Sequence, residues 1–175
     1  MTRLLAGALL LLPLLCAQSP QVKIVAKDPL QPLQFLEGSW EAKTGASTSG
    51  ANATGVYTFR KELGGHILAR HSSASGCKGP VDFDCDHADL LYVYQDSPTQ
   101  PLQAIYFDNE GHAIHYAVST PTATSVIFLS DASPSAPQFR LTYELKGAIM
   151  EGKFQMKLPG KSEWISYLEW SGGKK

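Results

Sequence analysis

Apolar and polar residues alternate over short stretches through most of the chain between residues 38 and 170. The chain there forms roughly ten segments rich in Val, Ile, Phe, Tyr, Trp and Thr, with clusters of Gly, Pro, Asn, Asp and Ser between them. Such spacing is typical of an antiparallel sheet closed into a barrel or folded into a sandwich. The expected strands are 38–43, 54–62, 66–73, 89–95, 102–107, 112–119, 125–130, 138–146, 149–157 and 163–170.

The connections between these segments predict which strands pair. Residues 63–65, 108–111, 146–148 and 159–161 hold the Gly, Asn and Asp residues that tight hairpins prefer. Strands that are neighbours in sequence should therefore pair in space. The clearest alternation predicts an inward face made of Phe139, Leu141, Tyr143, Leu145, Phe154, Met156 and Leu158. We expect an all-β antiparallel fold, either a barrel or a sandwich.

A short helix should precede the first strand. Asp28-Pro29 is a typical N-cap and first-turn pair, and Leu30, Leu33 and Leu36 follow at intervals of three. These leucines would lie on one face of the helix and close one end of the barrel. Beyond this segment, the sequence shows no helical periodicity of useful length.

The first residues are laid out as a secretory signal. Arg3 precedes the apolar run 4–15, and the small residue Ala17 follows it. We expect a signal peptide at 1–17, a flexible lead at 18–28 and one barrel domain at 29–171, in a secreted or periplasmic protein. A membrane-spanning helix needs roughly 20 apolar residues, so this run is short for one. Acylation at Cys16 is the alternative, which Leu15 disfavours because a small residue is expected there.

Charge excludes some classes of partner. The chain has 15 basic and 16 acidic residues, a net charge of −1, and no basic run before Lys174-Lys175. It therefore lacks the electrostatic footprint of a nucleic-acid-binding protein or of one attracted to an anionic membrane. We expect no nucleic acid partner and no stable membrane insertion once the signal is removed.

Two cysteines, Cys77 and Cys85, remain after the leader. In an oxidising compartment such a pair is expected to form a disulfide. With His71 and His87 the two thiols make a ligand set that zinc accepts, but the spacing differs from that of structural zinc motifs. A disulfide would also consume both thiols, so we expect the bridge, no metal, and His87 as a solvated loop residue.

Four segments carry a resemblance to a known family. They are Phe-Leu-Glu-Gly-Ser-Trp at 35–40, Leu-Gly-Gly-His-Ile-Leu at 63–68, Asp-Leu-Leu-Tyr-Val-Tyr at 89–94, and Ala-Ile-Tyr-Phe-Asp-Asn-Glu-Gly-His at 104–112. In this order they resemble an uncharacterised bacterial family of small lipocalin-like proteins, over nearly all of 33–170. The resemblance implies a calycin-type up-and-down barrel. Related ten-stranded barrels include the haem-binding nitrobindins.

We do not expect this chain to share the haem binding of the nitrobindins. In nitrobindin-type barrels the axial ligand is a histidine near the C-terminal strands. Here the last histidine is His115, and none occurs from residue 138 onward. His112 and His115, three apart on one expected strand, would point to opposite faces. We therefore expect no haem and no other cofactor.

Motifs of enzymatic chemistry are few. The sequence has no Gly-x-Ser-x-Gly elbow, no His-Glu-x-x-His and no glycine-rich phosphate loop. Glu110 with His112, or Asp108 with His115, would make an acid and base pair. We favour a turn at 108–111, because turns select these residue types without any catalytic role.

Aromatic residues in most expected strands suggest a function. A barrel of about this size leaves an interior for one small ligand, and an apolar lumen with a few polar groups is the usual form of such a site. We expect an exported carrier of a small, mostly apolar molecule. The alternative is that many of these rings are ordinary core, with Trp40 and Trp164 sealing the ends. The expected lumen residues are Arg70, His71, Tyr106, His115, Tyr143 and Phe154.

Two other classes of function remain open. One is an enzyme of the same fold that uses Arg70, His71 or His115 on a hydrophobic substrate, and the other is a packed barrel that works through its surface. A buried His or Asp with a strongly shifted pKa would favour the enzyme. An empty apolar pocket would favour the carrier, and a filled lumen the structural or interaction module.

Overall fold

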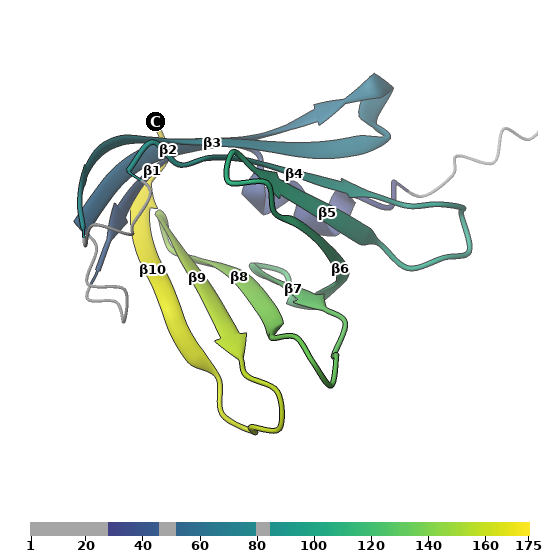
Figure 1. Cartoon of the computed structure of the whole chain (residues 1–175). Helices are drawn as coiled ribbons and strands as arrows, with labels where there is room; N and C mark the ends of the chain where they lie inside the picture. Colours follow the sequence, from purple (N-terminus) through teal and green to yellow (C-terminus); the bar gives the residue numbers. More distant parts are fainter. Residues whose placement is uncertain (1–27, 46–51, 80–84) are drawn as a thin grey trace, which may run out of the picture.

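The computed structural model describes residues 28–45, 52–79 and 85–175, which form a closed antiparallel barrel of ten strands (Figure 1). Around the barrel the strand order is β1-β10-β9-β8-β7-β6-β5-β4-β3-β2. The strands are β1 (Gly38–Thr44), β2 (Asn52–Glu62), β3 (Ile67–Lys78), β4 (Ala88–Tyr94), β5 (Gln103–Asp108), β6 (Ala113–Thr122), β7 (Ser125–Ser130), β8 (Gln138–Lys146), β9 (Ile149–Lys157) and β10 (Ile165–Gly173). The fold class predicted from sequence is confirmed, while the leader at 1–17 and the lead up to residue 27 lie outside the described residues.

Every strand pairs with its neighbour in sequence, and the first pairs with the last. Hairpin turns make the sequential pairing possible: Gly111 and Gly147 adopt φ angles of 91° and 63°, which other residues rarely tolerate. The barrel closes where Lys43 of β1 lies opposite Ser171 of β10. Next to this seam a side chain at Gly172 would collide with the backbone carbonyl of Glu41, so glycine is needed for the two strands to approach.

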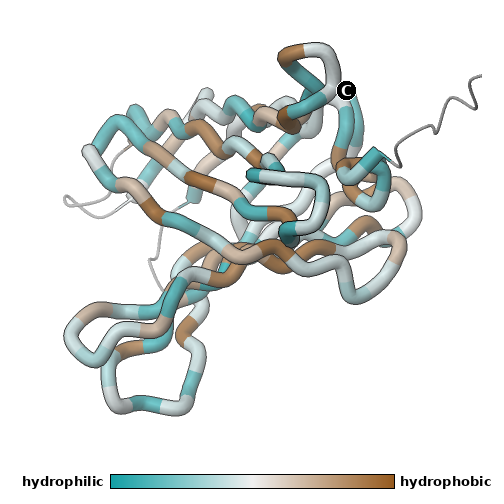
Figure 2. The backbone as a smooth tube through the Cα atoms, turned by 90° about the vertical axis from the view of Figure 1, so that its right-hand side faces the viewer, coloured by the Kyte–Doolittle hydropathy of each residue, from teal (hydrophilic) through white to brown (hydrophobic). Residues whose placement is uncertain are grey.

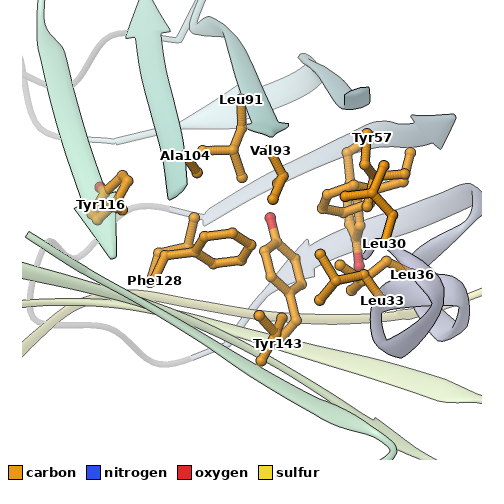
Figure 3. Close-up of a cluster of buried hydrophobic side chains, with 14 of the residues drawn as sticks. Leu30, Leu33, Leu36, Tyr57, Leu91, Val93, Ala104, Tyr116, Phe128 and Tyr143 are labelled. Carbon is orange, nitrogen blue, oxygen red and sulfur yellow. The ribbon is translucent and has the colours of Figure 1, made fainter. Parts of the chain in front are cut away.

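The segment before β1 is a single 3-10 helix, η1 (Gln31–Leu36). Leu30, Leu33 and Leu36 are fully buried and belong to the hydrophobic core (Figure 3). The expected leucine face is therefore present. The expected N-cap is not: the helix begins after Leu30, and Asp28 instead accepts a hydrogen bond from the Leu30 amide at 2.9 Å.

Apolar and polar positions alternate along the strands, as the tube in Figure 2 shows. Leu141 and Tyr143 of β8 are buried, and Phe139, Leu145 and Phe154 pack against the core. The expected inward position of Leu158 is wrong, since β9 ends at Lys157 and 40% of Leu158 is exposed.

The two tryptophans expected to seal the ends of the barrel, Trp40 and Trp164, differ in burial and in their contacts. Trp40 is buried and donates its indole N–H to the Leu36 carbonyl at 2.8 Å, which ties β1 to η1. Trp164 lies before β10 and is half-buried, with the guanidinium of Arg140 4.2 Å and the ammonium of Lys157 5.1 Å from its ring centre. Trp164 stacks against two cations and is not part of the hydrophobic core cluster of the described residues.

Cys77 and Cys85 form a disulfide, with their Cα atoms 5.3 Å apart. The bond joins the far end of β3 to the residues that lead into β4. The predicted bridge is confirmed, and both thiols are consumed by it. Such a bond is consistent with an oxidising compartment.

Candidate ligand-binding site

A cavity of about 620 Å³ occupies the half of the barrel that lies away from η1. Its volume falls within the range typical of small-molecule sites. The lining comes from the end of β1, the start of β2, and inward positions of β3 to β6 and β8 to β10. A second hollow, of about 670 Å³, lies beside η1 and the β6–β7 turn, and its lining residues carry no ionisable side chain.

One wall of the cavity is apolar and aromatic. The rings of Phe139 and Phe154 stack 5.6 Å apart at an angle of 10°, and Tyr167 meets Phe154 edge-on at 6.2 Å. Met156 and Leu168 extend this wall. These side chains come from β8, β9 and β10, where residues two apart usually share a face of the sheet. On β10 a register shift between Ser166 and Leu168 interrupts this alternation, and the neighbours Tyr167 and Leu168 both line the cavity.

The opposite wall holds a buried ion pair. Arg70 of β3 and Asp89 of β4 are 4% and 7% exposed, and an Nη atom of Arg70 donates to the Asp89 carboxylate. The other Nη atom donates to the hydroxyl of Tyr143 on β8, across the barrel. Arg70 shares its face with Leu68, and Asp89 shares its face with Leu91. The alternation of the strands therefore turns both charges inward.

His87, whose side chain is 33% exposed, continues this polar wall. Its Nδ1 lies 3.1 Å from Oε1 of Glu110, and its Nε2 lies 3.3 Å from both Oδ2 of Asp89 and the hydroxyl of Tyr106. The hydrogen bond to Asp89 raises the pKa of His87, an effect that partial burial opposes and Glu110 reinforces. In the protonated ring, both nitrogens donate to carboxylates.

The turn after β5 completes the polar wall. The Tyr106 hydroxyl donates to Oδ2 of Asp108 at 3.2 Å, and Nδ1 of His112 lies 2.8 Å from the same oxygen. Oδ1 of Asp108 accepts the backbone N–H groups of Glu110 and His112. Burial raises the pKa of Asp108, but its bonds to the backbone and side chain of His112 outweigh this and lower it. The turn predicted at 108–111 is present, and its side chains also line the cavity.

The buried groups differ in their preferred charge state. Burial alone would raise the pKa of Asp89, but the Arg70 guanidinium and His87 lower it below its usual value. Burial raises the pKa of Tyr106 and Tyr116, and raises that of Tyr143 to about 12. The tyrosines are therefore neutral at ordinary pH, while Asp89 is ionised.

The structure brings together four of the six expected lumen residues. Arg70, Tyr106 and Phe154 line the cavity, and Tyr143 is buried beside it, bonded to Arg70. His71 and His115 lie on the outer face. His71 follows inward Arg70 and His115 precedes inward Tyr116, so strand alternation turns both histidines outward.

Sequence reasoning missed His87, Asp89 and Glu110 as members of the site. Asp89 was detectable, because it shares the parity of Leu91 and Val93 on β4, both fully buried. His87 and Glu110 lie in connections, where alternation gives no direction. The acid and base pairs considered from sequence also differ from the observed ones, which are Glu110 with His87 and Asp108 with His112.

We expect stability to fall on both sides of a plateau between about pH 4 and pH 6.5. His87 has a folded pKa above its ordinary 6.5, so its contribution is complete below that pH and is lost as pH rises through the folded value. Asp89 and Asp108 have folded pKa values below 3.8, so their contributions are lost as pH falls through them. Urea unfolding midpoints measured from below pH 4 to above pH 6.5 should show the plateau and both declines.

Substitution of His87 separates the two declines. His87→Gln should flatten the alkaline decline and keep the acidic one, whereas His115→Gln on the outer face should leave the profile unchanged. An alkaline decline of full size in His87→Gln would contradict the assignment.

Comparison of the chain with protein-family models and with curated proteins finds no match in either. The closed ten-stranded barrel is compatible with a lipocalin-like fold. Within residues 28–45, 52–79 and 85–175, no helix has both the length and the apolar character needed to cross a membrane.

Proposed function

We propose that the protein is an exported carrier that binds one small, mostly apolar molecule in the barrel cavity. The observation that carries this proposal is the cavity itself, about 620 Å³ in volume, with the stacked rings of Phe139 and Phe154 on one wall. The leucines of η1 belong to the hydrophobic core cluster and do not line the cavity, so the cavity and the packed core occupy different parts of the barrel. Burial of apolar ligand surface against these rings would provide roughly 25 cal/mol per Å².

An enzyme of the same fold is the second candidate. The observation that supports an enzyme is the buried, ionised Asp89 beside His87. A carboxylate and a histidine with shifted pKa values in a cavity are common in acid and base catalysis. Both ring nitrogens of His87, however, already face carboxylates. A general base needs a free nitrogen within reach of substrate, so this arrangement favours binding over proton transfer.

The proposed location is extracellular or periplasmic, with 1–17 as the signal and lipidation at Cys16 as the alternative. The Cys77–Cys85 disulfide supports an oxidising compartment. The closed barrel, a fold compatible with ligand binding, supports the carrier role. We propose no haem ligand, because both histidines that line the cavity contact carboxylates: His87 contacts Asp89 and Glu110, and His112 contacts Asp108.

Binding of phenylnaphthylamine, a neutral apolar fluorophore, tests the carrier proposal. We expect one-to-one binding with enhanced emission. Met156→Trp replaces a thioether side chain of the cavity lining with a bulkier indole ring, which takes up space that the fluorophore needs. The substitution should weaken binding by about tenfold, equal to about 1.4 kcal/mol. The control Thr142→Trp adds the same ring to β8 at a position between inward Leu141 and Tyr143, and should leave affinity unchanged.

Far-ultraviolet circular dichroism of both variants shows whether the barrel is intact. Absence of binding to the wild-type protein would refute the carrier proposal. Equal affinities for the wild type and a folded Met156→Trp variant would place the fluorophore outside the cavity and refute it as well.

A further inference from the structure

Three buried polar atoms lack a hydrogen-bond partner among the described residues. They are the hydroxyl of Tyr57, Nε of Arg70 and Nε1 of Trp170. Buried polar groups in folded proteins are nearly always paired, so each exception calls for an explanation. All three atoms belong to side chains that line the cavity. They are therefore gathered at one place in the molecule.

That place is the region around Tyr143. The rings of Tyr57 and Trp170 each lie with their centres 5.7 Å from the Tyr143 ring, and Arg70 donates to the Tyr143 hydroxyl. Figure 3 shows Tyr143 standing between Phe128 and the leucines of η1, so this region borders the packed core. Burial raises the pKa of Tyr57 and the nearby Trp170 indole opposes the rise, yet the two groups do not reach hydrogen-bond geometry.

The unpartnered atoms have a common chemical character. The Nε–H of a guanidinium and the N–H of an indole can only donate, and a phenol hydroxyl can donate as well as accept. Their complement is an oxygen that accepts hydrogen bonds. We propose that the ligand carries a neutral carbonyl-type oxygen, as in a ketone, ester or amide, at the end that enters the cavity first. This proposal rests on the carrier function proposed above.

The charges of the site argue for a neutral oxygen and against a carboxylate. The single guanidinium, Arg70, already has a carboxylate partner in Asp89. Two more carboxylates, Asp108 and Glu110, line the same cavity, and His87 lies between Glu110 and Asp89. A ligand carboxylate would add a fourth negative charge to a wall whose guanidinium is already paired, and like charges disfavour one another in a buried site.

A ligand ammonium fits no better at the inner end. It can only donate, and the unpartnered atoms there include two that can only donate. A neutral carbonyl oxygen accepts from Arg70 or Trp170 without changing the charge balance. The rest of the molecule then lies along Phe139, Phe154 and Met156, where apolar contact is available.

Competition against phenylnaphthylamine with ligands of similar chain length tests the proposal. The series is nonyl methyl ketone, decane, decanoic acid and decylamine. Pairing of a buried donor gives the ketone an advantage over decane of about tenfold. We expect the acid and the amine, both charged at neutral pH, to bind at least about tenfold more weakly than the ketone.

A variant that lacks one of the buried donors tests whether that donor gives the ketone its advantage over decane. Trp170→Phe keeps an aromatic ring and removes the indole N–H, so it should lower the ketone's advantage about threefold or more while the affinity for decane holds. The control Trp164→Phe alters the tryptophan that stacks under Arg140 and Lys157 and should change neither affinity.

The outcomes separate this proposal from the carrier function. If no member of the series and no fluorophore binds, the carrier function fails. If all members bind with equal affinity, or the acid binds most tightly, the carrier function stands and the neutral-oxygen proposal is overturned. An undiminished preference for the ketone in both Trp170→Phe and Tyr57→Phe would also overturn it.

Discussion

Asp89→Leu should destabilise the protein by about 3–5 kcal/mol, the usual result of removing one partner from a buried ion pair. Asp89 and Arg70 are 7% and 4% exposed, so the substitution leaves a guanidinium in the barrel with no compensating charge. The hydroxyl of Tyr143 remains bonded to Arg70 but cannot balance its charge. Urea unfolding at neutral pH, followed by tryptophan fluorescence, measures the loss.

A double-mutant cycle isolates the pair. Arg70→Met alone should also destabilise, whereas Arg70→Met with Asp89→Leu removes both charges and should be more stable than either single variant. Glu62→Gln, which breaks the largely exposed ion pair of Arg60 and Glu62, should cost less than about 1 kcal/mol. A double variant as unstable as the sum of the two single variants would show that the ion pair is not the source of the loss.

Leu33→Ala should destabilise by about 3 kcal/mol, the second largest effect we expect. Leu33 is fully buried in the core through η1, and truncation leaves a cavity that its neighbours fill only in part. Leu158→Ala is the matched control: 40% of this leucine is exposed, and the expected loss is under about 1 kcal/mol. Equal losses in the two variants would mean that η1 does not form part of the core.

The strands were predictable because their signals are local. The ranges expected at 125–130, 138–146 and 149–157 coincide with β7, β8 and β9, and the hairpins between neighbours follow from glycine and Asn/Asp turn chemistry. The errors in the predicted strands occur at the strand ends. Leu158 continues the alternation of β9 in sequence, but β9 ends one residue earlier, and a strand end depends on its partner rather than on its own pattern.

The site was predictable only in part. Tyr143 was expected in the lumen from alternation and Arg70 from its place on an expected strand, but their hydrogen bond joins residues 73 positions apart. No periodicity relates such positions. His71 was expected beside Arg70 and lies on the outer face, because adjacent residues of a strand point to opposite sides.

The sequence by itself determined the all-β class, the sequential hairpin pairing, the leucine face of η1 and the Cys77–Cys85 bridge. Each depends on short-range periodicity, turn chemistry or a short separation along the chain. Closure of β1 on β10, the pairing of Arg70 with Asp89 and the position of His87 between Asp89 and Glu110 were decided by the tertiary structure. The physical reason is that a barrel brings distant strands together, and a buried charge is stable only where such a partner meets it.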